Sequence, residues 1–343
     1  MKKNIHLKLI LFLLVATNTA KSQDINFSQF YELPLLRNPA LAGIFAGDIR
    51  VTSAFRSQWQ SVTVPYRTIG LGVEYKRALN GNSNDFITYG LQATNDIAGD
   101  SRLRRTQIFP VLNFHKSLDT ERDTYLSAGV MGGAVMQRFD PSKLQFDDQF
   151  VNGSYSSSNP TKQAFNNTGF TYWDVSAGLN FSSVAGEDTR YYIGAGLFHI
   201  TKPKVAFQKQ YDIELNQKWV VNAGFSKPLT DLNKLIVYAD YFMQGGARQI
   251  QGGLLLSHDF VQTDEFQKIS LSGGLFYRYK DAVVPVIKLD YNKIGIGVNY
   301  DVNISKLKTA SQLRGSFEIT LSYKAFTSNQ NSSVNNVRCP AFY

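Results

Sequence analysis

The chain has 343 residues, a formal net charge of +9, a single cysteine and an aromatic content of 13%, mostly from 18 Tyr and 24 Phe. A lone cysteine excludes an internal disulfide framework, and the basic residues form no long run, so composition gives no support to nucleic-acid binding. Four of the 36 basic residues and none of the acidic ones precede residue 23, which leaves 32 basic against 27 acidic residues in the remaining chain.

The N-terminal residues have the three parts of a secretory signal peptide in the usual order. A positive start at Met1–Lys3 is followed by the apolar stretch Leu9–Ala16 and by small residues at Ala20–Ser22. The apolar stretch is shorter than the about 20 residues that a membrane-spanning helix needs. We therefore predict a signal peptide over residues 1–22, with cleavage before Gln23 and export of the mature chain.

Residues 23–47 form a segment of their own before the first predicted strand. Pro34 and Pro39 disfavour regular structure there, because proline lacks the backbone N–H that helices and sheets use. We expect this segment to fold into the mouth or lumen of the following domain as a plug, or to make a periplasmic contact. A plain linker is the simpler alternative.

From residue 48 onward, apolar side chains recur at every second position. In one such stretch Ile69, Leu71 and Val73 alternate with Gly70 and Gly72. Since successive side chains of a strand point to opposite faces, the pattern indicates strands with one apolar and one polar or small face. We predict fourteen strands, at 49–57, 66–77, 86–96, 103–115, 124–137, 172–182, 190–200, 217–227, 233–243, 247–258, 268–279, 283–291, 294–301 and 312–324.

The length of these strands separates two kinds of β-protein. Many have nine to twelve residues, close to the about 9–11 that cross a bilayer when tilted, whereas strands of soluble proteins average about 5–6. The sequence therefore predicts an all-β fold, a transmembrane antiparallel β-barrel of about 14 strands over residues 48–324. A polar C-terminal tail follows at 325–343.

The connections predict how the barrel sits in the membrane. The two longest, 138–171 and 201–216, both follow odd-numbered strands, whereas the tight turn 292–293 follows an even-numbered one. Outer-membrane barrels have short periplasmic turns and longer extracellular loops, so we expect the two long loops outside the cell. Trp59, Trp173 and Trp219 then fall near the outer rim, where aromatic rings favour the interface.

No motif predicts catalysis or cofactor binding. The three histidines beyond the leader lack metal-ligand spacing, and no zinc, nucleophile-elbow or phosphate-loop motif occurs. Asp147 and Asp148, adjacent in the long loop, are expected to be solvated. We predict no enzyme, no cofactor and no metal. The inward face carries charges of both signs, as a water-filled or plugged interior requires: Glu74, Asp174, Lys218, Asp240, Arg278, Lys288, Asp290, Arg314 and Glu318.

A series of short motifs resembles the PorP/SprF family of type IX secretion system membrane proteins. The mature chain opens with Phe27-Ser28-Gln29, followed by Arg37-Asn38-Pro39-Ala40 and Gly43; Arg56 to Trp59 then looks like the family's R-x-QW element. The segment 143–150, the pair Tyr300-Asp301 and the closing Arg338-Cys339-Pro340 are similar as well. Departures occur at Ile25-Asn26, where a Pro and a polar residue are expected, and at Phe317, where a His is expected.

The resemblance implies an outer-membrane barrel of a Gram-negative bacterium that assists secretion, surface retention or anchoring of large secreted proteins such as gliding adhesins. Its implied partners are outer-membrane lipid, a secreted client and periplasmic components of the type IX secretion or gliding machinery, and no nucleic acid. Candidate partner-binding residues are Arg37, Asn38, Pro39, Arg56, Trp59, Asp147 and Asp148. A general diffusion channel or hydrophobic-solute transporter, and a soluble secreted β-protein, are the alternatives. The sequence names no client and leaves open whether the lumen is plugged and whether the barrel is oligomeric.

Overall fold

The computed structural model describes residues 24–60, 64–79, 84–151, 153–186, 188–208, 210–262, 268–306, 311 and 314–327. The predicted signal peptide 1–22, its cleavage point at Gln23 and all but the first residues of the predicted tail lie outside these described residues. Within them, no helix has the length and apolar character needed to cross a bilayer.

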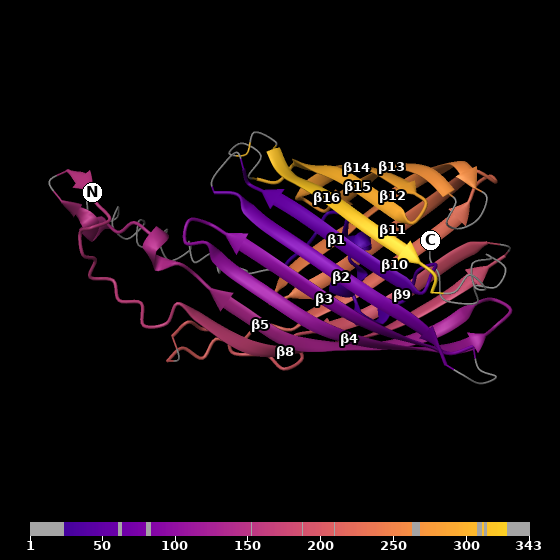
Figure 1. Cartoon of the computed structure of the whole chain (residues 1–343), viewed down its shortest axis with the longest axis horizontal. Coiled ribbons are helices and arrows are strands. Elements are labelled where there is room, and N and C mark those ends of the chain that lie inside the picture. The colour runs from indigo at the N-terminus through magenta and orange to yellow at the C-terminus, as the bar shows by residue number, and fades with distance from the viewer. Residues whose placement is uncertain are drawn as a thin grey trace, which may run out of the picture.

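Fourteen antiparallel strands close into a barrel, because the first strand pairs with both the second and the last (Figure 1). This confirms the predicted fold class and strand number, and every predicted strand end lies within four residues of the observed one. The strands are β1 (Ile49–Gln58), β2 (Tyr66–Ala78), β3 (Phe86–Ala98), β4 (Leu103–Asp119), β5 (Thr124–Arg138), β8 (Gly169–Ala185), β9 (Thr189–Phe198), β10 (Lys218–Pro228), β11 (Asn233–Gln244), β12 (Ala247–Gln262), β13 (Lys268–Arg278), β14 (Ala282–Tyr291), β15 (Ile294–Asn303) and β16 (Arg314–Ala325).

Alternation along each strand gives the barrel two chemically different faces. On β2 the outward Ile69, Leu71 and Tyr75 are exposed, whereas the inward Thr68 and Glu74 are buried. Closure leaves no unpaired sheet edge, which a bilayer requires because unpaired backbone groups in lipid cost several kcal/mol each. The outer wall is therefore apolar and the lumen polar. Most of the inward charges predicted from the sequence are buried there, whereas Arg314, the first residue of β16, is exposed.

The two ends of the barrel differ in the length of their connections. The loops 139–168 and 199–217 leave the same end, here called the loop end, and the first of them projects well beyond the barrel (Figure 1). The opposite turn end has short connections such as 186–188 and 292–293. This is the predicted difference in connection length between the two ends of the barrel. Trp173 and Trp219 face outward near the loop end and are 72% and 54% exposed.

The long loop 139–168 has local structure that the sequence did not predict. It contains two 3₁₀ helices, η4 (Pro141–Lys143) and η5 (Asp147–Gln149). A two-stranded sheet of β6 (Phe150–Val151) and β7 (Ser154–Tyr155) follows η5. Such short elements carry too little periodicity to be predicted from the sequence.

Residues 24–47, hereafter the lumen segment, lie inside the barrel. They form three 3₁₀ helices, η1 (Phe30–Glu32), η2 (Pro34–Leu36) and η3 (Pro39–Leu41), and nearly all their side chains are buried. Proline begins both η2 and η3, where its fixed φ suits a helix start and its missing N–H costs nothing. The segment runs from contacts with loop-end residues of β4 and β10 at Asp24 to the start of β1 at the turn end.

Candidate functional site

Arg37, the first predicted site residue, is held in the middle of the lumen by a buried ion pair. Its Nε and Nη2 atoms donate to the Asp240 carboxylate on β11, at 2.9 and 2.6 Å, and its Nη1 donates to the Tyr192 hydroxyl at 2.9 Å. The guanidinium also lies 5.0 Å from the ring centre of Phe30. A buried guanidinium requires such a partner, because an unpaired charge in a low-dielectric interior is strongly destabilising. Arg37 therefore fastens the lumen segment to the wall.

Asn38 and Pro39 form a second attachment. The Asn38 Oδ1 atom accepts from the backbone N–H of Ala40 at 2.9 Å and so caps η3, whose first residue is Pro39. The Asn38 Nδ2 atom donates to the carbonyl of Leu179 at 3.1 Å and to the Asn222 side chain at 3.0 Å. One side chain therefore both starts the helix and ties it to strands β8 and β10.

Glycines of the wall provide the space for this attachment. A Cβ atom on Gly178 of β8 would lie 1.9 Å from the Asn38 Oδ1 atom, and one on Gly129 of β5 would lie 2.5 Å from the Pro39 carbonyl carbon. Only glycine allows backbone and side chain to approach so closely. These strand glycines therefore form the surface on which η3 rests.

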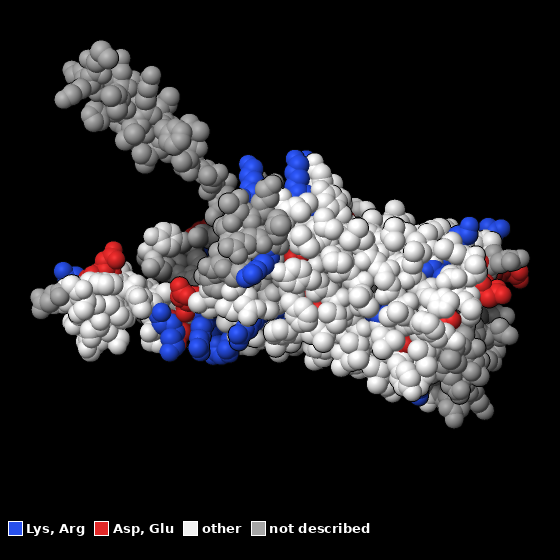
Figure 2. All heavy atoms as spheres, turned by 90° about the horizontal axis from the view of Figure 1, so that it is seen from above, with Lys and Arg blue, Asp and Glu red and all other residues white. Residues whose placement is uncertain are grey.

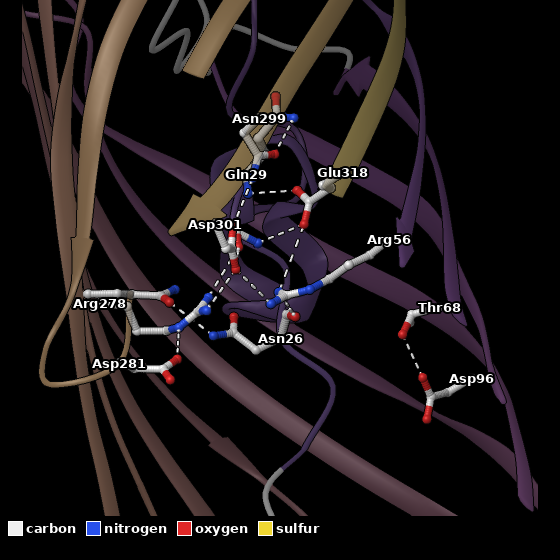
Figure 3. Close-up of polar contacts among 12 residues, drawn as sticks. Asn26, Gln29, Arg56, Thr68, Asp96, Arg278, Asp281, Asn299, Asp301 and Glu318 are labelled. Atoms are coloured by element: carbon white, nitrogen blue, oxygen red, sulfur yellow. Dashed lines mark hydrogen bonds and ion pairs between the residues drawn. The ribbon is translucent and has the colours of Figure 1, made fainter. Parts of the chain in front are cut away.

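The Ser28-Gln29 dipeptide is bound by acidic residues of β15 and β16. The backbone N–H groups of Ser28 and Gln29 donate to the two oxygens of Glu318, at 2.8 and 2.7 Å. The Ser28 hydroxyl donates to Asp301 at 2.8 Å, and the Gln29 amide donates to the Asn299 side chain at 2.8 Å. Figure 3 shows these side chains converging on the start of the lumen segment. Glu318 thus accepts two N–H groups that no helix or sheet would otherwise satisfy.

Arg56, on β1, belongs to the same cluster (Figure 3). It donates to the Asn26 carbonyl at 2.5 Å and to Asp301 at 3.0 Å. Arg278 of β13 donates to Asp301 from the other side at 2.8 Å and also pairs with Asp281. The cluster joins β1, β13, β15 and β16 through the lumen segment.

Further ion pairs fix the two ends of the segment. At the loop end, Asp24 pairs with Arg105 of β4 at 2.6 Å. Toward the turn end, Glu32 pairs with Lys288 of β14 at 2.7 Å, and the Gly43 backbone N–H donates to Glu74 at 2.8 Å. Attachment from end to end makes the segment an integral part of the barrel interior.

The lumen segment divides the interior into two polar cavities. A cavity of about 800 Å³ at the loop end is lined by residues including Arg56, Asp96 and Arg105. One of about 780 Å³ at the turn end is lined by residues including Lys288 and Lys324, and the two linings share no residue. A third pocket, between the segment and β10 to β12, has only about 20 Å³. Among the described residues, the lumen segment therefore lies between two separate cavities.

The other three predicted site residues lie outside the contacts between the lumen segment and the barrel wall. Trp59 follows the last residue of β1, is half-buried, and donates its backbone N–H to the carbonyl of Gly315 at 3.3 Å. Asp147 and Asp148 lie in η5 of the projecting loop. There the Lys162 backbone N–H, which donates to Asp148 at 2.6 Å, lowers the pKa of that carboxyl. The structure thus places Arg37, Asn38, Pro39 and Arg56 at contacts between the lumen segment and the barrel wall. It places Trp59, Asp147 and Asp148 elsewhere.

Several residues of the cluster were not singled out as site residues from the sequence. Asp240, Arg278 and Glu318 were predicted to face inward, but without partners, and Ser28 and Gln29 only formed part of a resemblance. Asp240 and Glu318 meet partners that lie 203 and 290 positions away in the chain, Arg37 and Ser28. An inward-facing charge was the one available signal, and it could not show which charges pair.

The described residues contain no group of three or more His, Cys, Asp or Glu side chains that could hold a metal ion. The buried His199 lies between Asp174, at 2.6 Å from its Nδ1 atom, and Asp24, at 3.3 Å from its Nε2 atom. These contacts hold the start of the lumen segment.

Comparisons with known proteins bear on the whole chain. The family described as type IX secretion system membrane protein PorP/SprF matches residues 19–323. Among curated proteins no match was found. Among solved structures, the Ralstonia pickettii toluene transporter TbuX is similar with 12% identity and a TM-score of 0.49, over 86% of this chain and 94% of that one. A Pseudomonas aeruginosa FadL homologue is similar with 8% identity and a TM-score of 0.49, over 85% and 94% of the two chains.

Proposed function

The chain belongs to the PorP/SprF family of type IX secretion system membrane proteins, and from that premise we propose that it assists secretion, surface retention or anchoring of large secreted proteins, such as gliding adhesins. The observation that carries the proposal is the extent of the family match, which includes the lumen segment as well as the barrel. In this proposal the mature protein, cleaved near Gln23, resides in the outer membrane of a Gram-negative bacterium.

The geometry of the lumen favours this role over a general diffusion channel. A channel needs a continuous water-filled path, whereas here the lumen segment lies between two cavities with no shared lining residue. Ion pairs from Asp24, Glu32 and Arg37 hold the segment in place at several levels of the lumen. A closed barrel suits a protein that serves as an anchor or accessory in the membrane.

The same geometry weighs against transport of hydrophobic solutes. The pocket lined by Phe27, Phe30, Leu33 and neighbouring residues has about 20 Å³, which is room for about one water molecule. The outward apolar rows of the strands likewise weigh against a soluble secreted β-protein, because such a wall in water would be an aggregation surface.

We propose two sets of partners, one at each end of the barrel. The secreted client meets the loop end, where loop 139–168 with Asp147 and Asp148 projects furthest (Figure 1). Periplasmic components of the secretion or gliding machinery meet the turn end. Loops carried on a rigid scaffold commonly provide binding surfaces.

The test is deletion of the gene in its host, followed by measurement of large secreted proteins at the cell surface and in the medium. Loss of a surface protein, restored by the wild-type gene, is expected. Affinity purification of the tagged chain from native membranes should recover that same protein together with periplasmic components. Unchanged surface proteins, combined with steady ion conductance of the purified chain in planar bilayers, would instead identify a channel.

A second variant isolates the role of the lumen segment. Deleting residues 24–44 should leave a barrel that still inserts, detected as heat-modifiable migration on a gel, because the strand pairing does not involve these residues. We expect secretion to fail in this variant. Normal secretion by an inserted barrel would show that the lumen segment is a linker without a functional role.

A further inference from the structure

Three arginines lie in one row on the outer face of the barrel, near the loop end. In the strand register, Arg67 of β2 is opposite Ile97 of β3, Ile97 is opposite Arg104 of β4, and Arg104 is opposite Arg138 of β5. Arg105, the neighbour of Arg104, points inward to Asp24, so Arg104 itself points outward. Figure 2 shows basic side chains gathered beside the base of the projecting loop.

The arrangement is unfavourable for the isolated protein. Residues directly opposite each other on antiparallel strands have Cβ atoms about 4.5–5.5 Å apart, and like charges there are destabilising. Among the described residues, Arg67, Arg104 and Arg138 form no ion pair and no side-chain hydrogen bond. Asp140, the nearest carboxylate along the chain after β5, accepts hydrogen bonds from Ser142. The row therefore lacks a counter-charge within the described protein.

The position of the row relative to the apolar wall suggests where that counter-charge comes from. Trp173, 72% exposed on β8, is in register with Ala134 of β5, four residues closer to the turn end than Arg138. Four residues span about 13 Å along a strand, and the strands of such barrels are tilted by about 35–45°. If Trp173 marks the aromatic girdle, the arginines lie farther out, at the level of the lipid headgroups of the outer leaflet.

We propose that Arg67, Arg104 and Arg138 bind the phosphate groups of a phosphorylated glycolipid in the surrounding outer leaflet. The guanidinium fork matches phosphate oxygens in a bidentate geometry, and charge-assisted hydrogen bonds of this kind are strong. A phosphate between Arg104 and Arg138 removes the repulsion between them, while Arg67, two strands away, reaches a second phosphate. Ile97 lies between Arg67 and Arg104 in the row and separates their charges.

The test measures binding of diphosphorylated lipid A to the purified full chain in neutral-detergent micelles. The variant R67Q/R104Q/R138Q should bind this lipid about 10- to 100-fold more weakly than the wild type, since each basic residue near an anionic membrane surface contributes about 1 kcal/mol. A matched variant, K143Q/K202Q/R248Q, removes the same charge from exposed loop-end positions outside the row. It should change binding by less than about threefold, because each isolated exposed charge contributes little. Equal losses in the two variants would overturn the specific site.

Two further probes identify the source of the phosphate. Dephosphorylated lipid A should bind the wild type and the triple variant equally weakly. Inorganic phosphate should fail to displace the lipid, because it lacks the acyl chains that contact the apolar wall. Displacement by inorganic phosphate at concentrations comparable to the lipid would show a free-anion site and overturn the lipid proposal.

A charge reversal distinguishes lost binding from lost folding. Arg104→Glu places a carboxylate opposite Arg138 and so creates a cross-strand ion pair in place of the repulsion. We expect the heat-modifiable band to melt at the same or a higher temperature without lipid, while lipid A affinity falls at least tenfold. A lower melting temperature in neutral detergent, or unchanged lipid affinity, would contradict the proposal.

Discussion

Arginines inside the lumen and arginines on the outer face of the same barrel differ in how their charge is balanced. Arg37 and Arg56 are buried in the lumen, and Arg105 is mostly buried there. Each of the three has an acidic partner within 3.0 Å. Arg104 and Arg138 lie opposite each other on the outer face, with no acidic partner among the described residues. The side chain is the same, and only the face of the strand differs.

The difference shows what each environment must provide. In the lumen the protein itself has to supply the counter-charge, because burial of an unpaired guanidinium is strongly destabilising. At the outer rim, solvent and lipid headgroups can supply it, so the chain need not. The buried pairs are therefore expected to determine whether the lumen segment stays docked, and the exposed charges to affect binding rather than folding.

The largest effect is expected from Asp240→Ala, which leaves Arg37 buried without its partner. Breaking a buried pair in this way costs about 3–5 kcal/mol. Arg37 takes no part in the strand pairing. We therefore expect the lost free energy to weaken docking of the lumen segment and to leave the barrel itself folded. We expect the variant barrel to insert normally and to show steady ion conductance in planar bilayers, whereas we expect none from the wild type.

The matched control for this prediction is Asp212→Ala. Asp212 pairs with Lys204 in a loop where the two side chains are 72% and 71% exposed, and such surface pairs contribute about 0–1 kcal/mol. The control should insert and remain closed like the wild type. If Asp240→Ala also stays closed, the Arg37 pair does not hold the segment in the lumen.

A smaller effect is expected where the lumen segment rests on wall glycines. Gly178→Ala would place a Cβ atom 1.9 Å from the Asn38 Oδ1 atom, and overpacking of this kind costs about 1–3 kcal/mol. Gly273→Ala, on β13, meets no atom within 4 Å and should change stability by less than about 1 kcal/mol. The measurements are the melting temperature of the heat-modifiable band and protease cleavage within residues 24–47. Equal behaviour of the two variants would show that Asn38 moves aside without cost.

The smallest effect concerns the exposed loop. The hydrogen bond from the Lys162 N–H lowers the pKa of Asp148, so the ionised form is favoured in the folded loop. Its stabilising contribution is complete above the unfolded pKa of about 3.9 and is lost as the pH falls through the lowered value. Amide exchange at Lys162, corrected for the intrinsic rate, should therefore be slowed at pH 7 and should lose this protection as the pH falls through the lowered pKa of Asp148.

Asp148→Asn should remove most of this protection at pH 7, because a neutral amide oxygen accepts a weaker hydrogen bond than a carboxylate. Asp147→Asn is the control, since the Asp147 side chain accepts no hydrogen bond from the described residues. Protection that persists in Asp148→Asn would mean that the loop is held by other contacts, such as the Gln149 to Asn159 hydrogen bonds.

The strands were predictable because their signal is local. Alternation with period two, as at Ile69, Leu71 and Val73, needs only neighbouring residues, and strand length then distinguished a membrane barrel from a soluble sheet. The short elements of loop 139–168 were missed because two or three residues are too few for a periodic pattern. Of the site, the sequence indicated Arg37, Asn38, Pro39 and Arg56 through a family resemblance, without their partners.

By itself, then, the sequence determined the strands, the faces they turn to lipid and lumen, and the end that bears the long loops. Tertiary structure alone decided that Arg37 meets Asp240, that Asn38 lies against Gly178, and that Arg104 and Arg138 face each other. The physical reason is that closing the barrel sets the register between strands and brings residues up to 291 positions apart into contact around the lumen segment. No local pattern encodes which of several inward charges will be opposite another.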